Sequence, residues 1–347
     1  MHHVNTDERY TGYDAARTAV AVGARGSRGW VRVWDVDAVS FLHGVLTNDI
    51  ASLVPGVWRY AAYLTPQGRM VSDMRVLRRA DDLVLETEPH VAQMLAHRFD
   101  ASIFTERVGL GVGIPWTGEA AESVGRHHAE TIVVCGPAAA GMIAAVLGND
   151  GLRLEPHHFA ELTREGDPLV LVGHNDLGTS AIDVTGSPEA CARLVHDLRT
   201  AGASALGSLA LEALRIEAGT PRFGIDMTDD TIPLEAGIEG RAISFTKGCY
   251  VGQEVIIRIL HRGHGRVARR LVGLRLDGED VPLPGSPVSS AGHDLGTITS
   301  AVFSPGLHRV IALGYVHRDA STSGTSVTVG AAGTPATVTD LPFRRPE

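Results

Sequence analysis

The chain has 347 residues, of which 44% are hydrophobic and 20% are charged, and its formal net charge at pH 7 is −9. This composition is typical of a globular protein with two or three domains and excludes a disordered or collagen-like chain. Because binding to phosphate backbones depends on an excess of Lys and Arg, the negative charge argues against stable nucleic-acid binding.

Three isolated cysteines, at positions 135, 191 and 249, form no C-x-x-C pair. Separate cysteines in odd number favour neither a disulfide framework nor a zinc site, and they are typical of a reducing compartment. The sequence shows no signal-peptide pattern, and no apolar run approaches the ~18 residues of a membrane span. We therefore expect a cytoplasmic protein that has neither a metal site nor a membrane partner.

The first third of the chain predicts one sheet with helices on one face. Residues 1–13 are polar and are predicted to form a loose tail. Gly29–Trp34 alternates as a strand does, and Asp37 is placed to cap a helix whose apolar face includes Phe41 and Leu42. Further strands are predicted over 59–64, 70–78 and 83–85, and a helix over 89–99.

A similar alternation of strands and helices returns in the second third of the chain. Strands are predicted over 131–135, 169–173 and 180–185, and helices over 137–147, 188–201 and 208–217. Ser187 is the expected N-cap of the second helix, and Pro188 occupies the first position of that helix. Ser208 is the expected N-cap of the third helix. Without a clear sequence repeat, this pattern still predicts a structural duplication of two α+β units.

After about residue 265 the helical periodicity disappears. The remaining strand-like runs are separated by turns rich in Gly and Pro, and they cover residues 271–276, 297–303, 310–316, 326–329 and 336–339. This pattern predicts a small all-β barrel or sandwich.

The stretch from Phe245 to Glu254 carries the most distinctive chemistry. Cys249 lies between two glycines, and Lys247 precedes it by two residues. A thiolate near a cation has a lowered pKa and becomes a nucleophile or a soft metal ligand. The alternative is a small buried cysteine in a Gly-rich turn.

The string Lys-Gly-Cys-Tyr-Val-Gly-Gln-Glu, residues 247–254, resembles the signature of the YgfZ family. This family consists of folate-binding proteins related to the glycine-cleavage T-protein, an aminomethyltransferase. Other segments are similar to this superfamily in the same order, at 41–50, 64–70, 214–219, 223–226, 233–236, 296–300, 304–305 and 311–316. The resemblance therefore extends over almost the whole chain.

The resemblance implies an α+β fold in which a duplicated folate-binding module precedes a small C-terminal β-barrel. We expect a loose tail over 1–13, an aminomethyltransferase-like module of two α+β subdomains over 14–264, and a T-protein-like barrel over 265–347. In this superfamily the folate lies in a central channel where the domains meet, so tetrahydrofolate or a one-carbon derivative is the expected cofactor.

The function implied by the YgfZ resemblance is that of an accessory factor for iron–sulfur cluster assembly or repair, which supports tRNA-modifying enzymes. Iron–sulfur proteins or assembly factors would be its partners. Cys249 would be essential, and Lys247 would stabilise its thiolate. A single thiolate does not hold a cluster permanently, because stable clusters usually take four protein ligands. We therefore expect transient ligation or redox exchange.

Departures from T-protein keep two alternatives open. Where a T-protein usually has two acidic residues after its Gly-rich turn, this chain has Ser72-Asp73, and the Glu-bearing T-protein stretch has its nearest match in Gly173–Gly178. The alternatives are a folate-dependent aminomethyltransferase or N-demethylase-type one-carbon transferase, and a non-catalytic interaction scaffold.

Five residues are candidates for folate binding. Asp73 lies on the less apolar face of its strand, where it would meet the folate nitrogens or pair with a neighbouring arginine. Arg215 and Glu217 are two residues apart on one helix, so they do not face each other. Asn48 follows the first helix, where Asn also serves as a C-terminal cap. Tyr250 is the fifth candidate, and its alternative role is to orient the loop through hydrogen bonds.

Overall fold

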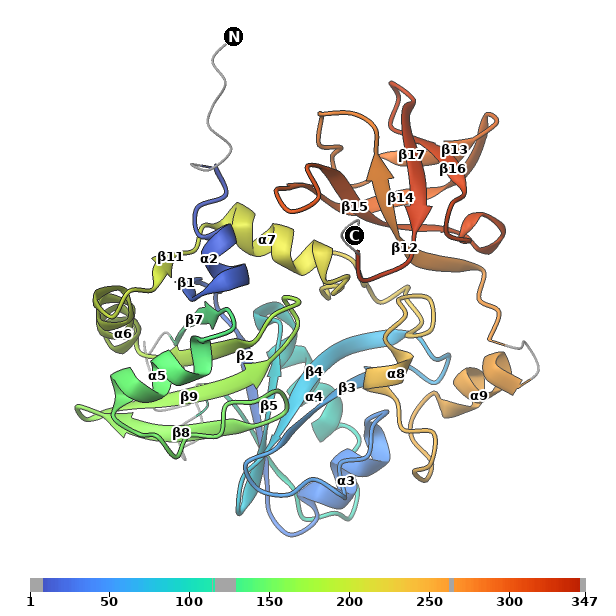
Figure 1. The fold of residues 1–347 in the computed structure, drawn as a ribbon. Helices are drawn as coiled ribbons and strands as arrows, with labels where there is room; N and C mark the ends of the chain where they lie inside the picture. Colours follow the sequence, from blue (N-terminus) through green and yellow to red (C-terminus); the bar gives the residue numbers. More distant parts are fainter. Residues whose placement is uncertain (1–8, 114, 116–128, 262–264, 344–347) are drawn as a thin grey trace.

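The computed structural model describes residues 9–113, 115, 129–261 and 265–343. These residues form two β-sheets that face each other, helices on the outer sides of both sheets, and a closed barrel beside them (Figure 1). Residues 1–8 of the predicted tail lie outside the described residues. The domain boundaries at 13/14 and 264/265 remain predictions.

The first sheet has five antiparallel strands in the order β3-β4-β5-β2-β6. These strands are β2 (Gly29–Trp34), β3 (Trp58–Leu64), β4 (Met70–Arg78), β5 (Asp82–Thr87) and β6 (Gly109–Val112). Two helices, α3 (Ala38–Val45) and α4 (Ala92–Asp100), pack on its outer face and bury a core that includes Phe41, Leu95 and Phe99. The 3₁₀ turn Pro89–Val91 precedes α4.

The second sheet has six strands in the order β11-β1-β7-β10-β9-β8. They are β1 (Ala21–Ala24), β7 (Glu130–Cys135), β8 (Phe159–Arg164), β9 (Asp167–His174), β10 (Ala181–Gly186) and β11 (Ser204–Ala205). Helices α5 (Ala139–Leu147) and α6 (Pro188–Thr200) cover its outer face. Because β1 belongs to this sheet and β2 to the other, residues 25–28 cross between the two sheets.

The inner faces of the two sheets meet in a small apolar cluster and a buried ionic network. Trp30 and Trp58 of the first sheet pack against Phe159 and Val172 of the second. Beside them, the guanidinium of Arg75 on β4 binds three carboxylates, from Glu86, Asp176 and Asp183, at 3.2, 2.8 and 2.8 Å. Two of these three acids belong to the second half of the module, so Arg75 joins the sheets.

The barrel is connected to the sheets through helix α7 (Ser208–Glu217), drawn in yellow between them in Figure 1. Apolar side chains of α7, of α2 (Tyr13–Thr18) and of the barrel form one buried cluster. The barrel closes in the strand order β12-β15-β14-β13-β16-β17. Its strands are β12 (Arg269–Leu276), β13 (Pro287–Ser290), β14 (His293–Ser304), β15 (Arg309–His317), β16 (Ser326–Val329) and β17 (Thr334–Thr339).

The predicted fold class is confirmed, as is the choice of a barrel. Several local predictions need correction. Asp37 occupies the N-cap of α3, but its carboxylate accepts a hydrogen bond from the Arg107 N–H rather than from the helix. The N-cap of α7 is Gly207, and Ser208 is its first residue. Ser187 does cap α6, since its hydroxyl accepts a hydrogen bond from the Ala190 N–H.

Two helices in the last part of the module were not predicted, α8 (Glu239–Ala242) and α9 (Gln253–His261). Helix α9 begins at Gln253, within the cysteine motif, and its apolar residues 255, 256, 259 and 260 have a helical spacing that the Gly-rich start of the motif obscured. Among the helices of the described residues, none is long and apolar enough to span a membrane.

Replacing Arg75 by Met should lower the free energy of unfolding by about 3–5 kcal/mol, because it leaves buried carboxylates without a cation. Chemical denaturation measures this change. The control is Arg193→Met, since Arg193 pairs with Asp167 and Glu165 near the surface and its loss should cost less than about 1 kcal/mol. Equal effects of the two substitutions would contradict the central role of Arg75.

Candidate functional site

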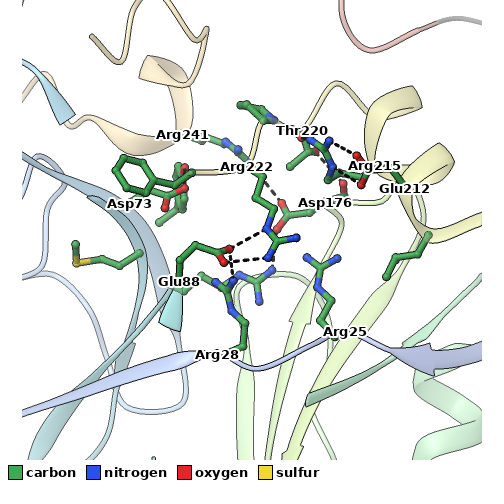
Figure 2. A pocket seen from close by; sticks show the side chains of 16 residues that line it. Arg25, Arg28, Asp73, Glu88, Asp176, Glu212, Arg215, Thr220, Arg222 and Arg241 are labelled. Carbon is green, nitrogen blue, oxygen red and sulfur yellow. Dashed lines mark hydrogen bonds and ion pairs between the residues drawn. The ribbon is translucent and has the colours of Figure 1, made fainter. Parts of the chain in front are cut away.

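A cavity of about 110 Å³ lies where the two sheets, the crossing segment, α7 and the residues after α7 meet (Figure 2). Its wall is rich in charged side chains from all of these elements: Arg25, Arg28, Asp73, Arg75, Glu88, Asp176, Glu212, Arg215, Arg222 and Arg241. Apolar contacts come from Met74, Leu211, Pro221 and Phe223. Segments distant in sequence therefore contribute to one site.

Asp73 is the one predicted folate-binding carboxylate that borders this cavity. It lies on β4 diagonally opposite Tyr60 of β3, and the Tyr60 hydroxyl donates a 2.6 Å hydrogen bond to its Oδ2. Within the described residues its second oxygen has no hydrogen-bond partner. The carboxylate keeps contact with the cavity, yet protein atoms surround it closely. Burial therefore raises the pKa of Asp73 above its ordinary value, although the Tyr60 hydrogen bond and the charges of Arg28 and Arg241 oppose this.

A second carboxylate, Glu88, bridges two arginines across the cavity, as Figure 2 shows. Its oxygens accept hydrogen bonds from Arg28 at 2.6 Å and from Arg222 at 3.0 Å. Burial disfavours the charged form of Glu88, but the hydrogen bonds and charges of the two arginines outweigh it and lower the pKa. The Arg222 side chain is 46% exposed, so this bridge lies at the outer edge of the site.

A third carboxylate, Asp176, pairs with Arg75 at 2.8 Å and with Arg241 at 3.2 Å. Burial opposes its ionisation, but the neighbouring cations hold its pKa well below its usual range. Arg241 in turn lies over the ring of Tyr60, 4.4 Å from the centroid. Asp176 and Glu88 are thus fixed as carboxylates, whereas Asp73 is the acid of this wall whose pKa is raised.

The structure separates the two candidates on α7. Arg215 reaches the cavity wall, where it binds Asp226 at 2.7 Å and the Ser300 hydroxyl at 2.9 Å. Glu217 points instead to the junction of α2, α7 and the barrel, where it accepts hydrogen bonds from Tyr13 and Ser304 and pairs with Arg17. Its position two residues after Arg215 turns it to another side of the helix.

The remaining predicted residues lie behind the cavity wall. Asn48 is buried, and its side-chain amide donates to the backbone carbonyls of Tyr60 and Arg241, both at 2.8 Å. The Lys247 ammonium donates to carbonyls at the end of α3 rather than contacting the thiol, and it lies 5.2 Å from the centroid of the buried Tyr250 ring. Desolvation lowers the pKa of Lys247 to about 8.

Cys249 is exposed, whereas Cys135 and Cys191 are buried. Within the described residues, Cys249 has no hydrogen bond or ion pair. The alternative of a small buried cysteine is therefore wrong for this position. The cysteine is free to meet a reagent or a partner from solvent.

Sequence reasoning missed several residues of the cavity wall: Arg28, Tyr60, Glu88, Arg222 and Arg241. Arg28, Glu88 and Arg241 are isolated charged residues without local periodicity, and Tyr60 is one residue of a strand, so these four gave no signal. Asp176, which was also missed, and Arg222 had a weak signal. The former lies in the segment 173–178 singled out above, and the latter directly precedes the segment 223–226.

Two family models match the chain. Residues 11–247 match the GCVT N-terminal domain, and residues 269–344 match the glycine cleavage T-protein C-terminal barrel domain. An aminomethyltransferase of Rubrobacter xylanophilus is 28% identical over 334 residues, which are 96% of this chain and 85% of that protein. One of Streptomyces avermitilis is 29% identical over 339 residues, 95% of this chain and 88% of that protein.

A solved structure shares the fold. The crystal structure of glycine cleavage system aminomethyltransferase T from Bartonella henselae matches with a TM-score of 0.81 and 23% sequence identity. The match covers 96% of this chain and 88% of that one.

The raised pKa of Asp73 predicts an unusual pH dependence of stability. Its ionisation costs more in the folded than in the unfolded protein, so its contribution to stability falls as pH rises from the unfolded to the folded pKa. Asp73→Asn removes this cost while its amide oxygen still accepts the Tyr60 hydrogen bond. The melting temperature of the variant relative to the wild type should therefore increase from pH 4 to pH 7. A relative loss over that interval would contradict the assignment.

Proposed function

Because the chain belongs to the family of the GCVT N-terminal domain and the glycine cleavage T-protein C-terminal barrel domain, we propose that it binds tetrahydrofolate in the central cavity and transfers a one-carbon unit. The observation that carries this proposal is Asp73, a carboxylate of raised pKa in a cavity lined by cations and apolar side chains. The two relatives named above are both aminomethyltransferases, and their names support the same reaction class.

The residues of the cavity fit part of a tetrahydrofolate molecule. The volume of the cavity is below the ~300–1,000 Å³ of sites that enclose a whole drug-sized ligand. The cavity would therefore enclose only the ring system of tetrahydrofolate. Asp73 offers an oxygen to ring nitrogens, and Met74, Leu211 and Phe223 offer apolar contact. Arg222, at the exposed edge, offers a guanidinium to the carboxylates of the tail.

The chemistry available to the protein is proton transfer and orientation. When bound, tetrahydrofolate supplies the nitrogen atoms that accept a one-carbon unit. Asp73 can hold a proton on the oxygen that Tyr60 does not bind and deliver it to the amine that leaves the donor. Tyr60 orients the carboxyl group, and the pairs around Glu88 and Asp176 keep the surrounding cations in place.

The second candidate function is that of a YgfZ-type accessory factor for iron–sulfur cluster assembly or repair. One observation favours it: the single exposed cysteine of the described residues lies in the motif that resembles that family. Cys249 is not among the residues that line the cavity. In this role the folate site would regulate or assist chemistry at the thiol, and iron–sulfur proteins or assembly factors would be the partners.

Asp73→Asn separates binding from turnover in the transferase. Formation of methylenetetrahydrofolate from an aminomethyl donor, with release of the amine, should fall by about 10²–10⁴-fold, the contribution of a general acid–base group. Anaerobic calorimetry should still detect tetrahydrofolate binding by the variant. Asp81→Asn is the control, because Asp81 is exposed and outside the cavity wall. Absence of product with wild-type protein that binds folate would reject the transferase.

Cys249→Ser tests the accessory function. If the thiol acts on clusters, the variant should fail to restore an iron–sulfur-dependent tRNA-modifying enzyme in cells that lack this protein, while its folding and tetrahydrofolate binding stay unchanged. Full restoration by the variant would reject this role, and methylenetetrahydrofolate formation by the same variant would favour the transferase.

A further inference from the structure

A buried residue, Asn48, joins the cavity to the cysteine loop, residues 245–252. Asn48 holds two residues of the cavity wall by their backbone, because its amide donates to the carbonyls of Tyr60 and Arg241 at 2.8 Å each. The side chains of these two residues stack on each other, and the Tyr60 hydroxyl binds Asp73. Any movement of this part of the wall therefore acts on Asn48.

On its other side, Asn48 belongs to the anchor of the cysteine loop. The Lys247 ammonium donates to the backbone carbonyls of Asn48 at 3.2 Å and of Leu46 at 2.7 Å, and also to that of His43. These carbonyls lie at or just beyond the C-terminal end of α3, where a cation is favourable because the last carbonyls of a helix have no partner inside it. Lys247 thus binds α3, and Cys249 stands exposed two residues later.

A neighbouring residue strengthens the same link. The Thr47 hydroxyl donates to the Ala242 carbonyl at 2.7 Å, and the Ser244 N–H donates to the Thr47 carbonyl at 3.1 Å. The segment from Arg241 to Lys247 is therefore bound along its length to residues 47 and 48. One end of this segment lines the cavity and the other end leads into the cysteine loop.

We infer that Asn48 and Lys247 are positioning residues that couple ligand binding in the cavity to the reactivity of Cys249. A ligand that enters beside Tyr60 must displace or contact the Arg241 side chain, which is 35% exposed, and the backbone of Arg241 is tied to Asn48. The coupling rests on the proposed folate binding. By linkage it is reciprocal, so modification of Cys249 changes the affinity of the cavity by the same factor.

The test measures the rate at which iodoacetamide alkylates Cys249, with and without saturating tetrahydrofolate under anaerobic conditions. Burial raises the pKa of Cys135 to about 12 and that of Cys191 to about 11, so the reaction reports on Cys249. In the wild type, tetrahydrofolate should change the rate by about five-fold or more. In Asn48→Ala and Lys247→Met the change should shrink to within about two-fold, although calorimetry still detects binding.

Two controls separate positioning from charge and folding. Lys247→Arg keeps a cation for the α3 carbonyls and should recover the ligand response. Arg258 is exposed and makes no hydrogen bond or ion pair within the described residues, so Arg258→Met removes a positive charge from the same part of the chain and should respond as the wild type does. Circular dichroism verifies that each variant folds.

The outcomes distinguish this inference from the proposed function. If the wild type binds tetrahydrofolate with an unchanged alkylation rate, or if both variants keep the full response, the coupling is rejected and folate binding stands. If the wild type does not bind tetrahydrofolate, the proposed function fails, and the coupling is then tested without ligand by adding Tyr60→Phe to the wild type and to Lys247→Met. Tyr60→Phe should change the alkylation rate of Cys249 in the wild type and leave that rate unchanged in Lys247→Met. Any other result overturns the inference.

Discussion

The arrangement of this protein depends on one buried cation, the guanidinium of Arg75. Its three carboxylate partners come from β5, from β10 and from the segment after β9, so it is satisfied only when both sheets are in place. A buried arginine without partners is strongly unfavourable, and this makes the relative position of the sheets specific in a way that apolar contact alone does not. The apolar cluster around Trp58 adds area to the same interface.

The ionic network also determines the electrostatics of the cavity. Arg28 and Arg222 are bound to Glu88, and Arg75 and Arg241 are bound to Asp176. Within the described residues, Asp73 makes a hydrogen bond to Tyr60 but no ion pair. The pKa of Asp73 is therefore raised, whereas the pKa values of Glu88 and Asp176 are lowered, and this difference suits Asp73 to the proton transfer that we propose.

The cysteine loop obeys a different constraint. Lys247 binds the end of α3, so the loop is fixed by a helix of the first sheet and not by the thiol. The motif is consequently divided into an anchored part, with Lys247 and the buried Tyr250, and an exposed part at Cys249. The loop is therefore fixed although solvent reaches its cysteine. Asn48 lies between the loop and the cavity, because its carbonyl binds Lys247 and its side chain binds the cavity wall.

The sequence by itself determined most of the elements and the fold class, because alternation and helical spacing are local patterns. It distinguished the polar face of β4, with Asp73 and Arg75, from the apolar face that packs under α3 and α4. It also singled out the segment around Cys249. Only the tertiary structure decided that Glu217 faces the barrel while Asp73 faces a cavity, and that Arg28, Glu88 and Arg222 meet across it. Such partners come from separate segments, and their meeting follows from the packing of the two sheets and α7 rather than from any local pattern.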